Sequence, residues 1–156
     1  MADLAELHQE LGSLIGFTLA AVLILRRAAA LAAQEDKHEL ARLLQQLDSA
    51  TGQVERRSQM LVGRHAGLRA GTITAKARQI KAGIMGYCRE DATVRDLLEL
   101  LKGLMSQIGI STAALTAHSS SSNDMAVAEF AEFLVLAQES WAIAVSEASD
   151  RLERAI

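Results

Sequence analysis

The chain has 156 residues, of which half are hydrophobic, only 3% are aromatic and none is proline. This size fits one domain, and a chain rich in helix formers without proline favours helices joined by short connections. The net charge is −3 and Cys88 is the only cysteine, so an intrachain disulfide is excluded and a reducing, cytoplasmic location is expected.

The first part of the chain predicts two long helices joined by a tight hairpin. The first is expected over residues 2–34. Asp36 and Glu39 have the spacing of a capping box, in which each side chain accepts a hydrogen bond from a free backbone N–H. The second helix is therefore predicted to begin near Lys37 and to end near Val62, unless residues 48–52 interrupt it.

A glycine-rich stretch predicts a loop after the second helix. Gly63, Gly67 and Gly71 lie close together, and each glycine in a helix interior costs roughly 1 kcal/mol relative to alanine. The third helix is expected to resume near Thr74 and to reach Tyr87.

Two further start signals divide the rest of the chain. Thr93 and Asp96 form another capping-box pattern, which predicts a fourth helix through a run of leucines. Residues 119–123 are expected to form a loop, and Asp124 is expected to cap a last helix over residues 125–154. Together the segments predict an all-α fold, an antiparallel four- to five-helix bundle with long first and last helices, in a single domain spanning residues 1–156.

The first predicted helix is apolar on every side between Leu11 and Leu25, where it carries no charge. A bundle helix normally keeps a polar outward side. Leaving about six large apolar residues in water forgoes on the order of 10 kcal/mol, at about 1.5–3 kcal/mol each. Gly12, Gly16 and Ala20 add a row of small residues that lets another helix approach closely. We therefore expect this helix to pack against something outside its own bundle.

The last predicted helix departs from a simple two-sided pattern as well. Val135, Leu136 and Ile143 fall among its acidic residues, on the side that should face water. A contiguous apolar band of this kind marks a contact surface, here for further copies of the chain or for a helical protein partner. The predicted contact residues are Leu11, Leu14, Ile15, Phe17, Leu19, Val22, Leu23, Leu25, Phe133, Leu136 and Ile143.

Two other interpretations of the apolar first helix remain open. A membrane span needs about 20 apolar residues, and this stretch is about five residues short before Arg26 and Arg27 end it. Alternatively, the helix is an unusually apolar central helix that the other helices cover. Lipid contact is therefore a second candidate, behind protein contact.

Charge is segregated along the chain. Eight of the 16 basic residues lie between Arg56 and Arg89, a segment without Asp or Glu. Such a segment predicts an anionic partner, first of all the acids of the last helix in the same chain or in a neighbouring copy. A phosphate, nucleotide or lipid headgroup is an alternative, while the acidic pI of about 5.8 argues against nucleic acid. The candidate anion-binding residues are Arg56, Arg57, Arg64, Arg69, Lys76, Arg78 and Lys81.

No motif predicts a reaction. Glu35 and His38 give one Glu-x-x-His pair where a di-iron bundle uses two, and no His/Cys spacing fits zinc. His118 precedes a run of serines, but no nucleophile elbow is present. We expect no enzyme activity, metal or cofactor, and predict a helical assembly or interaction protein, such as a homo-oligomer, filament subunit or helical adaptor or chaperone. A membrane- or lipid-associated protein and an anion or nucleic-acid binder through residues 56–89 are the alternatives.

Overall fold

The computed structural model describes residues 4–154, in which every element of regular structure is an α-helix. The five helices are α1 (Leu4–Gln34), α2 (His38–Arg64), α3 (Ala70–Met85), α4 (Val94–Ser122) and α5 (Met125–Arg154). The predicted all-α bundle with long first and last helices is confirmed.

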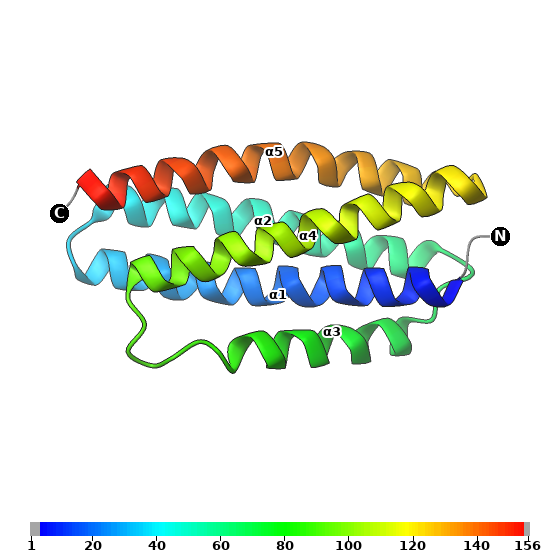
Figure 1. Ribbon diagram of the computed structural model, residues 1–156, viewed down its shortest axis with the longest axis horizontal. Coiled ribbons are helices and arrows are strands. Elements are labelled where there is room, and N and C mark those ends of the chain that lie inside the picture. The colour runs from blue at the N-terminus through cyan, green and yellow to red at the C-terminus, as the bar shows by residue number, and fades with distance from the viewer. Residues whose placement is uncertain (1–3, 155–156) are drawn as a thin grey trace.

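Four long helices run side by side, and the shorter α3 lies outside them against α1 (Figure 1). α1 contacts α2, α3 and α4, whereas α5 packs against α2 and α4. α3 and α5 therefore lie on opposite sides of the molecule, with the other three helices between them (Figure 1).

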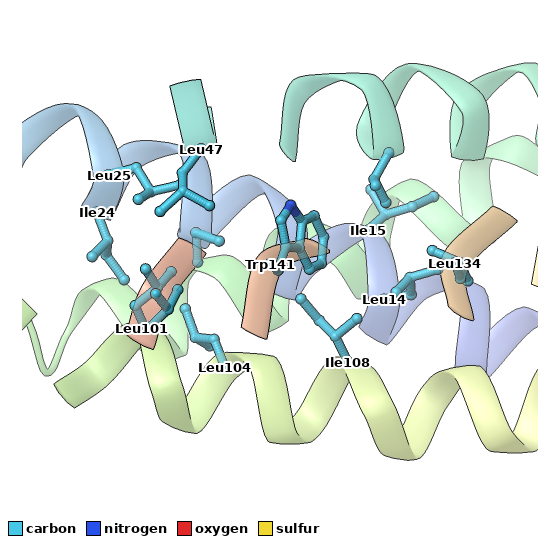
Figure 2. Packing of buried hydrophobic residues seen from close by; sticks show 14 of the residues in the cluster. Leu14, Ile15, Ile24, Leu25, Leu47, Leu101, Leu104, Ile108, Leu134 and Trp141 are labelled. Atoms are coloured by element: carbon cyan, nitrogen blue, oxygen red, sulfur yellow. The ribbon is translucent and has the colours of Figure 1, made fainter. Parts of the chain in front are cut away.

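The core between the long helices is mainly aliphatic. Figure 2 shows Leu14 and Ile15 of α1, Ile108 of α4, and Leu134 and Trp141 of α5 pointing into one interior. All five side chains are buried. The repeats of three and four residues in the sequence place such side chains on one side of each helix, which is why these segments fold as helices and pack together.

The turn between α1 and α2 is built differently from the prediction. Asp36 adopts a left-handed conformation with φ of 60°, and its N–H donates to the Ala33 carbonyl at 3.1 Å while the Lys37 N–H donates to the Ala32 carbonyl at 2.8 Å. This is the hydrogen-bond pattern of a Schellman motif, which ends a helix. Asp36 thus terminates α1, and the predicted capping box with Glu39 is wrong, since α2 begins without a side-chain cap.

The second helix is continuous through residues 48–52 and ends at Arg64. The buried hydroxyls of Thr51 and Ser58 each donate to the carbonyl four residues earlier, so polar side chains are accommodated inside the helix. The loop that follows is shorter than the loop predicted from the three glycines. α3 begins at Ala70, and Gly71 therefore lies in its first turn.

The Thr93–Asp96 capping box is confirmed. The Asp96 N–H donates to Thr93 Oγ1 at 3.2 Å, and the Thr93 N–H donates to Asp96 Oδ2 at 3.0 Å. Hydrogen bonding from Thr93, first from its backbone N–H and then from its side chain, lowers the pKa of the Asp96 carboxyl.

The predicted serine loop is wrong, because α4 continues through Ser122. The hydroxyls of Ser121 and Ser122 both donate to the His118 carbonyl, which keeps these side chains satisfied in the last turn. The connection is reduced to two residues, and Asp124 caps α5 as predicted, with the Val127 N–H donating to Asp124 Oδ1 at 3.2 Å.

Candidate functional site

The apolar side chains of α1 are covered by the chain's own helices. Of the predicted contact residues on this helix, five are buried, namely Leu11, Leu14, Ile15, Val22 and Leu25, and three are partly buried, namely Phe17, Leu19 and Leu23. α2, α3 and α4 surround the helix, so its apolar character on every side is explained inside one subunit. The expectation that α1 presents a contact surface to another molecule is therefore corrected.

The row of small residues on α1 is occupied by α3. A Cβ atom added at Gly12 would lie 2.6 Å from Lys76 Cβ, and one at Gly16 would lie 2.6 Å from Ile80 Cβ and 2.8 Å from the Ala77 carbonyl oxygen. Real Cβ atoms do not approach so closely, so the missing side chains are what lets the two backbones meet. The predicted close approach thus occurs within the chain rather than between copies.

α5 keeps an apolar band on its outer side. Leu136 and Ile143 are 65% and 70% exposed, and the neighbouring Val135 is 44% exposed. Phe133 is partly buried, and the Arg57 guanidinium lies 4.3 Å from its ring centroid, so this ring is covered by a cation–π contact. Leu136 and Ile143 are the predicted contact residues that stand open on the surface.

The predicted anion-binding residues follow the end of α2, the next loop and α3. Arg56, Arg57, Arg64, Arg69 and Arg78 are exposed, and Lys76 and Lys81 are partly buried. Neither these seven nor Arg89 makes an ion pair with a carboxylate of residues 4–154. The α3 part of this segment lies on the opposite side of the molecule from α5, whereas Arg57 of α2 reaches α5 but contacts the Phe133 ring rather than a carboxylate.

The acids of α5 are largely unpaired as well. Glu147 bonds Arg151 at 3.0 Å, and Arg151 also bonds Glu39 of α2 at 2.6 Å, which raises the pKa of the guanidinium, mainly through Glu147. The remaining acids of α5 are exposed and have no ion pair with the described part of the chain; they are Glu129, Glu132, Glu139, Asp150 and Glu153. The molecule therefore has a basic side at α3 and an acidic side at α5.

One end of the bundle gathers three of the four histidines. The side chains of His65 and His118 lie against Asp124, with their Nε2 atoms 2.7 Å and 3.6 Å from Asp124 Oδ2. His8 reaches the same α2–α3 loop from α1, accepting a hydrogen bond from the Arg69 N–H at 2.9 Å. The three histidines are 53 or more positions apart in the sequence, so their spacing gave no signal for this cluster.

Burial and hydrogen bonding act in opposite directions on the Asp124 carboxyl. Burial would raise its pKa, but the hydrogen bond from His65, the Val127 N–H and the charges of His65 and His118 together bring the pKa below its usual value of 3.8. The carboxylate therefore stays ionised beside the two imidazoles at neutral pH.

The serines at the histidine end are hydrogen-bonded to their own helix. Ser119, Ser121 and Ser122 donate to backbone carbonyls rather than to an imidazole. No group of three His, Cys, Asp or Glu side chains within residues 4–154 is placed to hold a metal ion. An open groove of about 710 Å³ lies between the start of α1 and the end of α4, with Glu6, Glu10 and His118 in its lining.

One helix in the described range, α1, is long and apolar enough to cross a membrane by length and composition. The core helix of a soluble protein passes the same test, and 56% of the relevant stretch is buried under other helices. The apolar length of α1 therefore does not decide between lipid and the protein core as its surroundings.

Comparisons with known proteins add no relative: no family model, no curated protein and no solved structure matches the chain.

Proposed function

We propose that this chain is a non-enzymatic helical assembly protein, in which the basic side of one copy packs against the acidic side of the next. The observation that carries the proposal is the separation of charge. The cations around α3 and most acids of α5 have no ionic partner in their own chain, within residues 4–154, and lie on opposite sides. Complementary surfaces of this kind direct association and fix its register.

The acidic side also offers apolar area. Leu136 and Ile143 lie on the outer face of α5 among exposed acids, with Glu139 between them in the sequence. On the basic side, Tyr87 is 81% exposed just after α3 and supplies an apolar surface near Arg89. Burying such side chains stabilises a contact by about 1.5–3 kcal/mol for each large residue fully removed from water, while the charges select the orientation.

The opposite placement of the two surfaces predicts the form of the assembly. A contact between two different surfaces is heterologous, and it produces a ring or an open filament rather than a closed dimer. Because α3 and α5 are on opposite sides, successive copies would stack in line. We therefore expect a mass that rises with protein concentration rather than a fixed dimer.

Light scattering with charge-reversal variants tests this proposal. The wild-type mass should rise with concentration at low salt and fall toward the monomer near 1 M salt, where the Debye length is only about 3 Å. Arg78→Glu with Lys81→Glu should abolish association, as should Glu132→Lys with Glu139→Lys. Combining all four substitutions restores opposite charges across the contact and should restore association.

Arg95→Glu on α4 is the matched control, because Arg95 is exposed and lies in neither surface. It should leave the mass unchanged. A wild-type chain that stays monomeric at every salt and protein concentration would refute the proposal. Failure of the combined variant to recover would show that the two surfaces do not meet each other.

The same unpaired cations favour a second candidate function, binding to an anionic lipid surface. Lys76 and Lys81 lie on either side of the stripe of Ile73, Ala77 and Ile80 that packs α3 onto α1. Sedimentation with phosphatidylserine vesicles, lost in Arg78→Glu with Lys81→Glu, would support this candidate. An unchanged distribution with and without such vesicles would exclude it.

A further inference from the structure

Two histidines hold the loop that leads into α3. The Gly67 N–H donates to His65 Nδ1 at 3.1 Å, and the Arg69 N–H donates to His8 Nε2 at 2.9 Å. His8 comes from α1 and is only 9% exposed, while the side chain of His65 is 16% exposed. The loop of residues 65–69 is thereby attached to two imidazoles that are largely shielded from water.

These contacts use one nitrogen of each ring as an acceptor. A backbone N–H can only donate, so the ring nitrogen facing it must carry no proton. The other nitrogen is the donor: His8 Nδ1 lies 2.6 Å from the Leu4 carbonyl, and His65 Nε2 lies 2.7 Å from Asp124 Oδ2. A ring protonated on both nitrogens could not accept either loop N–H.

Of the described helices, the one behind this loop buries the fewest side chains. α3 has two buried side chains, Ile73 and Ala77, and α1 is the helix it packs against. Arg69 occupies the N-cap position of α3, and its side chain makes no capping hydrogen bond to the first turn. Elements with few buried contacts open at lower free energy than the core, so α3 depends on its loop to stay in place.

We propose that protonation of His8 and His65 releases the α2–α3 loop and lifts α3 from the glycine row of α1. Histidine changes its charge between pH 5 and 8, so mild acidification is the trigger. The exposed surface would be the stripe of α1 that contains Gly12 and Gly16. This switch concerns one chain and does not depend on the proposed self-association.

The charged groups around the two rings give them different roles. Arg69 lines the groove beside His8, so a charged His8 ring would be placed near another cation in a shielded position. His65 faces Asp124, with His118 against the same carboxylate. A protonated His65 ring would keep its bond to Asp124 while losing the Gly67 N–H, so it would hold the start of α5 and release the loop.

Hydrogen exchange of the full chain measured by mass spectrometry tests the switch. After correction for the intrinsic exchange rate, amides of residues 66–85 should exchange at least about tenfold faster at pH 5.5 than at pH 7.5, the factor expected for loss of one hydrogen bond of about 1.4 kcal/mol. Peptides from α4 and α5 should keep their protection. Equal corrected rates at the two pH values, or loss of protection throughout the chain, would overturn the proposal.

A non-titrating variant separates the switch from general acid loosening. In His8→Gln with His65→Asn, a side-chain oxygen can accept the loop N–H at any pH, and the difference between pH 5.5 and 7.5 should disappear. His38→Gln is the control, because that histidine is 71% exposed at the other end of α1 and α2, and it should behave as wild type. Persistence of the full pH effect in the double variant would refute the role of the two rings.

Discussion

α1 and α3 lie against each other but bury very different shares of their residues. Half of the 31 residues of α1 are buried, and three helices surround it, whereas α3 buries two residues against a single helix. The helix with the most apolar sequence is thus the best covered, and the shorter helix beside it buries the fewest side chains. Apolar content shows that a helix needs cover, but it does not show whether that cover comes from the same chain.

The largest expected effect on stability comes from a substitution in the buried core around α1. Leu14 is fully buried between the long helices, so Leu14→Ala should lower the free energy of unfolding by about 2–5 kcal/mol through lost transfer energy and a residual cavity. Chemical denaturation checks this value. Leu136→Ala on the exposed face of α5 should change stability by no more than about 0.5 kcal/mol, and an equal loss in both variants would contradict the burial of α1.

Much of the fold could be predicted from the sequence because its signals are local. The Thr93–Asp96 and Asp124 caps are formed as expected, since a cap depends on residues three positions apart. The Asp36 box was wrong because the same aspartate serves a competing local structure, the end of α1. The loop predicted at the serine run is wrong because serine hydroxyls can also donate to backbone carbonyls within a helix.

The surfaces were harder to predict, because they depend on which helices become neighbours. Gly12 and Gly16 were correctly read as a place of close approach, but their partner is α3 of the same chain. The meeting of His8, His65 and Asp124 requires three helix ends to converge, and no spacing in the sequence encodes that. Leu136 and Ile143 could be read directly, since their positions among acids already place them outside.

One added methyl group should break the contact between α1 and α3. Gly16→Ala would place its Cβ within 2.6 Å of Ile80 Cβ, so α3 must shift or leave, at a cost of about 1–3 kcal/mol for overpacking. Hydrogen exchange should show lost protection in α3 with the four long helices unaffected. Gly103→Ala on α4 is the control, because nothing lies within 4 Å of its added Cβ, and it should stabilise by about 0.5–1 kcal/mol.

The smallest expected effect concerns the tie between the α3 loop and the long helices. Asp124→Ala removes the cap of α5 and the partner of His65, and should cost about 1 kcal/mol at pH 7. Asp124→Asn keeps a capping oxygen but no charge, so it should retain most of the cap and lose the ionic part.

The pH dependence of this tie follows from the lowered pKa of Asp124. A carboxyl whose folded-state pKa lies below its unfolded value stabilises the fold fully above that unfolded value, near 3.8, and loses the contribution as pH falls through the lower folded-state pKa. The contribution of the ionised carboxyl to the stability difference between wild type and Asp124→Asn is therefore complete above about pH 5 and should shrink below about pH 4. Thermal unfolding across this range checks it. A difference that grows on acidification below pH 4 would show that the carboxyl is not stabilised in its ionised form, and the loop would then be tied to α5 by a neutral contact.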